Sequence, residues 1–307
     1  MGVTRFPHGA SSFGAPVVGG GLPATFGNYF YVSSLTGNAN YDGLSTQYPL
    51  PTIALALDKC VASNMDVIVC LPGHNEGFGD AQLAIDVAGV SVIGVGQGTL
   101  TPRIDFDHAN ASIDITASNV LLRNFRLLPS VTAVLIGIDV NAAATDVRLE
   151  DIEILPGEDG AGVDEFALGI DVKAGCDRLR IKNFKERQHA SAAGTIAGIR
   201  LTGASDDITI DGADINIIGA GVVAPINGIT TLSTNVYIRN AVLVSDAEPG
   251  IEMLTGTTGV LQDVDIYSNL ATLAAAVVGD GFAYFRVQNV EVAGESGGVV
   301  GTASVDD

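Results

Sequence analysis

The stretch that decides the fold reads IDITASNVLLRNFRL and covers residues 113–127. Apolar residues stand at every second position over 113–115, over 120–122 and again over 125–127. A period of two is typical of a β-strand that buries one face. Small turn residues separate the first two runs, and Asn124 separates the last two. The stretch therefore predicts short strands joined by tight bends.

The same unit recurs along the chain, which is the sequence pattern of a solenoid. Further copies cover residues 138–154, 170–184, 199–215 and 236–243, an earlier coil covers 90–95, and weaker copies end at 263–266 and 289–292. The bend is anchored in successive copies by Asn124, Asp151, Asn183, Gly212, Asn240, Asp263 and Asn289. These anchors are 27, 32, 29, 28, 23 and 26 residues apart. A constant strand motif with variable spacing predicts loops of different length at one corner of each coil.

We predict an all-β fold, a right-handed parallel β-helix that covers residues 29–307. Asn, Asp and Gly tolerate left-handed backbone angles, so they suit the bends, and stacked bends should align Asn side chains into a ladder. Right-handed winding follows from the chirality of parallel crossovers. No segment between the strands is long enough for the helices of an α/β fold. The predicted core column contains Val120, Leu122, Leu149, Ile181, Ile210 and Ile238.

The N-terminal part has a different character. Residues 1–28 are rich in Gly and Pro without sustained periodicity, so we interpret them as an extended arm without a core of its own. A strand is expected at 29–33, a polar turn region at 37–45 and a further strand at 67–71. Between the last two, residues 50–61 suit a short helix capped by Thr52.

Composition limits the function. Hydrophobic residues make up 47% of the 307-residue chain, which is enough for a continuous core. The 35 acidic and 15 basic residues give a net charge of −20, so we expect no nucleic-acid partner. No apolar run approaches the ~18 residues of a membrane helix, and no signal peptide is visible. We therefore expect that the protein is made in the cytoplasm and does not associate with a membrane.

Carboxylates that could be catalytic occur on the repeats. Asp139 and Asp171 occupy equivalent positions in adjacent coils, as do Asp114 and Glu252, and together they could line one outer sheet. Glycoside hydrolysis requires two convergent carboxylates. Sugar-binding grooves usually offer aromatic faces, yet the chain has no Trp. We predict a solvent-exposed acidic stripe, no catalytic residue and no enzyme activity.

Metal and cofactor sites are not expected. Asn38, Asn40 and Asp42 resemble half of a calcium loop, but Pro49 stands where a bidentate Glu belongs, which leaves a simple turn or a calcium site open. The cysteines show no ligand spacing and are predicted to be buried reduced thiols: Cys60, Cys70 and Cys176. The histidines are scattered and are expected at surface or coil positions: His8, His74, His108 and His189.

Two features resemble known families. The segments at 29–34, 40–45, 49–53 and 67–74 resemble the opening of pectate-lyase-like β-helix proteins, a group that includes phage tailspikes and other virion proteins. In that group a helix caps the first coil. The family's catalytic residues have no counterparts in this chain. Thr4-Arg5-Phe6-Pro7-His8-Gly9 is similar to the start of structural proteins of some tailed phages.

These resemblances imply a virion structural protein, a capsid decoration protein made in the host cytoplasm. Its arm would bind the major capsid protein or another virion protein, with Arg5, Phe6, Pro7 and His8 as the docking residues. Virion β-helices commonly form trimers, so the resemblance also implies a homotrimer. The alternative is a tailspike or receptor-binding β-helix that acts on host polysaccharide. A secreted polysaccharide lyase is disfavoured by the missing signal peptide.

Overall fold

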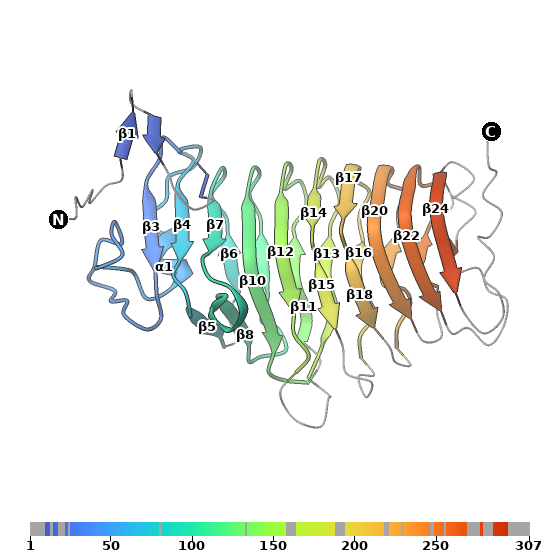
Figure 1. The fold of residues 1–307 in the computed structure, drawn as a ribbon, viewed down its shortest axis with the longest axis horizontal. Helices are drawn as coiled ribbons and strands as arrows, with labels where there is room; N and C mark the ends of the chain where they lie inside the picture. Colours follow the sequence, from blue (N-terminus) through green and yellow to red (C-terminus); the bar gives the residue numbers. More distant parts are fainter. Residues whose placement is uncertain are drawn as a thin grey trace, which may run out of the picture.

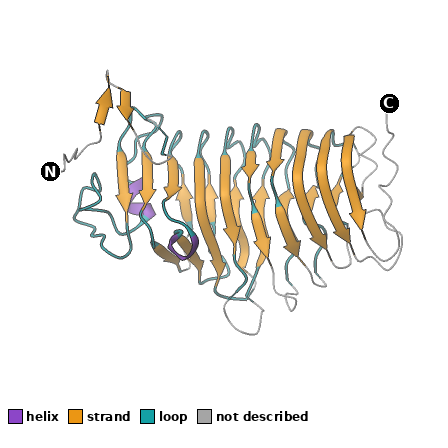
Figure 2. Ribbon diagram, viewed as in Figure 1, coloured by secondary structure: helices purple, strands orange, loops and turns teal. Residues whose placement is uncertain are grey.

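The chain forms a parallel β-solenoid with very little helix (Figures 1 and 2). The computed structural model describes residues 10–12, 15–17, 22–23, 25–79, 82–132, 134–157, 164–187, 194–217, 221–228, 230–245, 249–254, 256–268, 277–278 and 285–293. Strands of successive coils pair in parallel along two sheets. In Figure 1 the strands of the near sheet run downward while the coils advance from left to right, which is right-handed winding. The predicted fold class is confirmed.

The near sheet, which we call the bent sheet, has 14 strands in the described part of the chain. They are β3 (Tyr29–Val32), β4 (Val67–Cys70), β5 (Asn75–Phe78), β7 (Ser91–Gly94), β8 (Arg103–Phe106), β10 (Leu121–Pro129), β12 (Arg148–Ile154), β14 (Arg180–Lys182), β15 (Lys185–Arg187), β17 (Asp206–Asp211), β18 (Asp214–Ile217), β20 (Thr234–Ser245), β22 (Gly259–Ser268) and β24 (Phe285–Ala293). From β4 onward, each coil contributes one stretch of strand to this sheet before a bend and one after it.

The other sheet, the back sheet, has eight strands among the described residues. They are β6 (Leu83–Ile85), β9 (Ile113–Ile115), β11 (Val134–Val140), β13 (Phe166–Val172), β16 (Ala197–Leu201), β19 (Ile226–Gly228), β21 (Ile251–Met253) and β23 (Val277–Val278). The links from the bent sheet to the back sheet differ in length, as predicted for one corner: residues 155–165, 188–196, 218–225 and 246–250.

The bends have the backbone that the sequence predicted. Positive φ angles, between 51° and 77°, occur at Asn124, Asp151, Asn183, Gly212, Asn240 and Asp263. A step of the ladder joins two neighbouring bends, where Asn183 Nδ2 donates to Asp151 Oδ1 at 2.8 Å. It stops at Gly212, where a Cβ would lie 2.9 Å from the Asn183 Oδ1 atom. The left-handed bend therefore recurs from coil to coil, whereas the side-chain ladder is interrupted at Gly212.

The interior is one continuous apolar column. All six predicted core residues are at most 1% exposed: Val120, Leu122, Leu149, Ile181, Ile210 and Ile238. Burial of such a side chain stabilises the fold by about 1.5–3 kcal/mol relative to exposure. The stacked coils therefore hold together through apolar contacts between neighbouring layers.

A short helix closes the first coil. α1 (Ile53–Leu57) buries Ile53 and Leu57, and Thr52 Oγ1 accepts the Leu55 N–H at 3.3 Å as its N-terminal cap. The predicted helix and its cap are confirmed, but the helix ends earlier than expected. After Leu57 the N–H groups of Lys59 and Cys60 donate to the carbonyls three residues back, at 3.1 and 2.9 Å, which ends the α-helical pattern, and the Val61 N–H donates to the Asp66 carboxylate at 2.8 Å. No helix of the described residues is long and apolar enough to span a membrane.

The segment predicted as an arm includes two short paired strands, β1 (Ala10–Ser12) and β2 (Ala15–Val17), which run antiparallel. In Figure 1 they lie above the upper ends of β3 and β4, at the N-terminal end of the solenoid. Nearer the body, Leu22 packs on Val67, Val69 and Ile93, which are apolar residues on the outer face of the bent sheet. The last residues of the arm are therefore attached to the first coils.

Candidate functional site

The back sheet carries a row of polar residues, one per coil, on its outer face. The row, which we call the polar row, consists of Asp114, Asp139, Asp171, Arg200, Asn227 and Glu252, paired in register across β9, β11, β13, β16, β19 and β21. Its members alternate with inward apolar residues, so the period of two positions them. The predicted alignment of Asp139 with Asp171 and Asp114 is confirmed.

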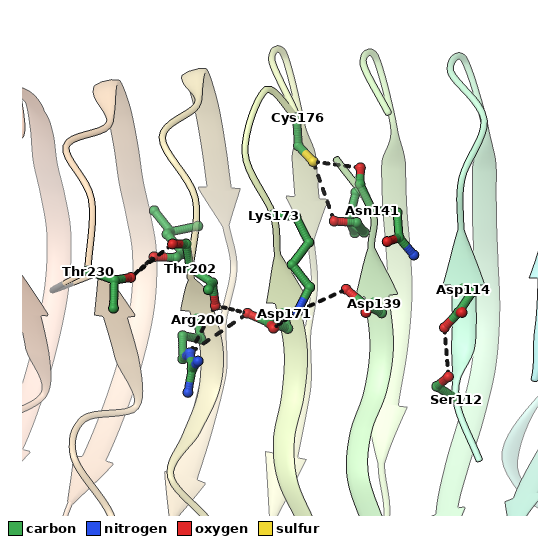
Figure 3. Close-up of polar contacts among 12 residues, drawn as sticks. Ser112, Asp114, Asp139, Asn141, Asp171, Lys173, Cys176, Arg200, Thr202 and Thr230 are labelled. Atoms are coloured by element: carbon green, nitrogen blue, oxygen red, sulfur yellow. Dashed lines mark hydrogen bonds and ion pairs between the residues drawn. The ribbon is translucent and has the colours of Figure 1, made fainter. Parts of the chain in front are cut away.

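The expectation of a solvent-exposed stripe is wrong for Asp171, which is 1% exposed. Its Oδ2 atom accepts a hydrogen bond from the Lys173 ammonium, and its Oδ1 atom accepts one from the Thr202 hydroxyl (Figure 3). The Arg200 Nε atom lies 3.8 Å from the same Oδ1 atom. A buried carboxylate requires such partners, because its desolvation would otherwise be costly.

Lys173 joins two coils. Its Nζ atom also lies 3.6 Å from Asp139 Oδ1, so one ammonium faces the carboxylates of β11 and β13 (Figure 3). Burial lowers the pKa of Lys173, but the hydrogen bond and charge of Asp171 outweigh this and raise it above its usual value. The lysine is therefore held in its charged form.

Asp139 is a carboxyl of the polar row with a raised pKa. Burial raises its pKa to about 6, since the pull of Lys173 toward lower values is opposed by the charges of Asp171 and Asp114. A carboxyl that titrates near neutral pH, next to an ammonium and a second carboxylate, is the kind of group that can serve in acid–base chemistry. It is also what a structural ion-pair ladder produces.

The ends of the polar row are satisfied locally. Asp114 Oδ1 accepts a hydrogen bond from the Ser112 hydroxyl at 2.6 Å (Figure 3). Glu252 Oε2 accepts one from Asn227 Nδ2 at 3.3 Å. Within the described part of the chain, no three His, Cys, Asp or Glu residues are grouped so that they could hold a metal ion. The contacts of the row are therefore made with itself and with neighbouring residues of the same stack.

The segment that resembles a calcium loop forms local turns. Asn38 Oδ1 accepts the Asn40 N–H at 2.9 Å, and Asp42 Oδ1 accepts the Leu44 N–H at 3.0 Å. These are Asx turns, in which the side-chain oxygens serve the backbone. The simple-turn interpretation fits the geometry.

The three cysteines form no disulfide. Cys70 and Cys176 are buried as predicted, whereas Cys60 is only half-buried. Burial raises the pKa of Cys60 to about 12 and that of Cys176 to about 11. Both thiols therefore stay protonated and unreactive at neutral pH.

One buried polar cluster was missed in the sequence. His74 is 1% exposed; its Nδ1 atom accepts the Ser34 N–H at 2.9 Å, and its Nε2 atom lies 3.1 Å from Glu76 Oε2. The same Glu76 oxygen accepts the Ile53 N–H at the start of α1, at 2.9 Å. The cluster ties the capping helix to the first coils. A His-x-Glu spacing after a Pro-Gly turn was the only signal in the sequence.

The predicted docking residues Arg5, Phe6, Pro7 and His8 lie outside the described residues. The structure does describe where the C-terminal end of the arm is attached to the first coils. The Thr25 hydroxyl donates to the Met65 carbonyl, and the Asn28 N–H donates to Asp66 Oδ1 at 2.6 Å. Asp66 is 1% exposed and also binds Val61 and Asn64, so it fixes the root of the arm.

Comparisons with known proteins found distant structural likenesses. No protein-family model matches the sequence, and no curated protein matches it. A rhamnogalacturonan lyase structure is similar with 12% identity and a TM-score of 0.41, over 78% of this chain and 74% of that one. A GH136 lacto-N-biosidase from Eubacterium ramulus is similar with 11% identity and a TM-score of 0.24, over 89% of this chain and 67% of that one. Similarity at this level says nothing about the activity of this chain.

Proposed function

We propose that this chain is a non-catalytic structural protein of a tailed-phage virion, a capsid decoration protein. Its solenoid would project from the shell, and the arm of residues 1–28 would bind the major capsid protein. The non-catalytic part of the proposal rests on the hydrogen bonds and ion pairs that Asp171 already makes. The most buried carboxylate of the polar row is saturated by Lys173, Arg200 and Thr202. A carboxylate used in this way stabilises the stacking of coils and is not free to attack or protonate a substrate.

The attachment of the arm supports the docking part of the proposal. Leu22, Thr25 and Asn28 hold its last residues on the first coils. The described end of the arm is therefore fixed to the first coils, at one end of the solenoid. Arg5 and Phe6 would be the anchors, because Arg offers a rigid fork of donors and Phe a large apolar face.

The docking part is tested with undecorated shells. Deletion of residues 2–17 keeps Leu22 and Asn28, so the body should fold and unfold as the full chain does. The deletion and the Arg5→Ala/Phe6→Ala variant should both lose binding to shells in co-sedimentation. Tyr267→Ala is the matched control, since Tyr267 is an aromatic residue on β22 of the body, outside the arm, and is 51% exposed. Full occupancy by the truncated protein would show that the arm does not dock.

A tailspike or receptor-binding β-helix that acts on host polysaccharide is the second candidate, and the titration of Asp139 favours it. The raised pKa of this carboxyl beside Lys173 is compatible with acid–base catalysis. We expect no release of reducing or unsaturated sugars from pectin, alginate or host capsule, with or without calcium. Reproducible release that Asp139→Asn abolishes would establish the second candidate and refute the first.

A further inference from the structure

The corner where the chain enters the bent sheet repeats a left-handed backbone position from coil to coil. In register, this position is held by Met65, Gly89, Asn119, Asp146, Arg178, Asp207 and Asn235, with φ angles between 53° and 82°. Gly, Asn and Asp are the residues that favour this conformation. Arg178 departs from the rule but binds both carboxylate oxygens of Asp146, at 2.8 and 2.7 Å. Among these seven residues, Met65 alone has an apolar side chain, and it is 54% exposed.

Two further apolar side chains are exposed at the same corner. Phe26 is 94% exposed and Val61 is 60% exposed. The Thr25 hydroxyl donates to the Met65 carbonyl, so the chain at Phe26 lies beside Met65. The Asn64 N–H donates to the Val61 carbonyl at 3.1 Å, which closes the turn that carries Met65. We call Phe26, Val61 and Met65 the apolar corner. An apolar residue that breaks a local preference without an evident gain in stability is a candidate for contact with a partner.

The backbone next to Phe26 is held in place by the first coils. The Asn28 N–H donates to Asp66 Oδ1 at 2.6 Å, and Asp66 is 1% exposed. A Cβ on Gly27 would clash with the Asn64 carbonyl oxygen, so the chain passes directly against that turn. The Phe26 ring is therefore exposed on a fixed backbone. Aromatic side chains presented in this way lose little conformational freedom on binding, and they are common anchors of protein interfaces.

The charges of the chain are segregated from this end of the solenoid. Residues 1–65 contain two basic residues, Arg5 and Lys59, and two acidic residues, Asp42 and Asp58, so their net charge is zero. Residues 66–307 therefore carry the whole net charge of −20. The acidic bodies of neighbouring copies repel one another. The apolar corner belongs to the part of the chain that adds no net charge, so contact through this corner does not require two acidic bodies to pack together.

We propose that the apolar corner is a second contact with the shell protein and that it fits an apolar depression on that protein. This inference rests on the proposed function, because the partner is the one that the arm binds. The last residues of the arm are held at the same corner, so a partner that binds the arm is tethered beside it. An apolar partner surface is indicated because the corner offers an aromatic ring, a thioether and a branched aliphatic group.

The test is a binding titration of the full chain with undecorated shells, measured by co-sedimentation. The corner variant is Phe26→Ser/Met65→Asn, in which Asn suits the left-handed position as Asn119 does. The matched control is Leu35→Ser/Leu100→Ser, which removes two apolar side chains that are 73% and 56% exposed. Leu35 follows β3 whereas Phe26 precedes it, so the control alters the opposite end of that strand. Circular dichroism checks that both variants are folded, and analytical ultracentrifugation measures self-association of the free chain.

The corner variant should bind shells roughly tenfold more weakly than the wild type, or weaker still, and the control should bind as the wild type does. Equal binding of the corner variant and the wild type would overturn this inference and leave the docking of the arm intact. Equal losses for the corner variant and the control would also overturn it, because binding would then reflect general apolar adhesion. Wild-type self-association that the corner variant abolishes would identify a second copy as the partner instead. A wild type that binds no shells would refute the proposed function itself.

Discussion

Replacement of Asp171 by alanine tests whether the polar row belongs to the structural framework. Asp171 is 1% exposed, and the substitution would remove the shared partner of Lys173, Arg200 and Thr202. Breaking a buried ion pair costs about 3–5 kcal/mol when the remaining charge stays buried. Here the side chains of Lys173 and Arg200 are 29% and 27% exposed, so water can partly solvate them after the change. We therefore expect a loss of about 2–3 kcal/mol.

The assay is urea unfolding at neutral pH, followed by circular dichroism and by a second probe. Solenoids can unfold coil by coil, so coincidence of the two probes must be checked before a free energy is assigned. Asp146→Ala is the matched control, because it removes an ion pair whose two side chains are 39% and 49% exposed. Its unfolding should be close to that of the wild type. If Asp171→Ala unfolds as Asp146→Ala does, the row does not stabilise the stack, and a functional role for its carboxylates becomes the better explanation.

Three further predictions concern buried polar groups. Because the pKa of Asp139 is about 6 in the folded chain, against ~3.9 unfolded, the wild type should gain stability relative to Asp139→Asn as pH falls from 7 to 4; equal pH profiles in thermal unfolding would refute this. His74→Ala should remove the acceptor of the Ser34 N–H and speed its hydrogen exchange, whereas unchanged exchange would show that this contact is dispensable. Gly198→Ala should lower the midpoint of urea unfolding, since the new Cβ would lie 2.5 Å from a carboxylate oxygen of buried Glu186; an unchanged midpoint would show that this side chain can move aside.

The repeat and its bends could be predicted from the sequence because both depend on local chemistry. Asn124 and Asp151 adopt the left-handed backbone that their residue types favour. Ile181 and Ile210 are buried because alternation fixes which face of a strand is apolar. Thr52 caps α1 because its side chain lies next to the N–H groups it can accept.

The buried polar contacts could not be predicted, because they depend on the register between coils. His74 binds a backbone N–H that is 40 residues away in the chain. In the sequence, Lys173 stands two residues after Asp171, and this spacing places both side chains on the same face of an extended chain. The burial that turns this pair into part of the framework depends on Arg200 and Thr202 of the next coil. The alignment of the coils was predicted correctly, but the burial of these polar side chains was not.

The most direct test of the proposed function is an electron-microscopy map of the purified particle that contains this chain. We predict rod-shaped densities that repeat over the capsid surface, each with its N-terminal end at the shell and the arm of residues 1–28 in contact with the capsid protein. A map that places the solenoid only at the tail tip, or one in which the capsid surface carries no such rods, would contradict the proposal.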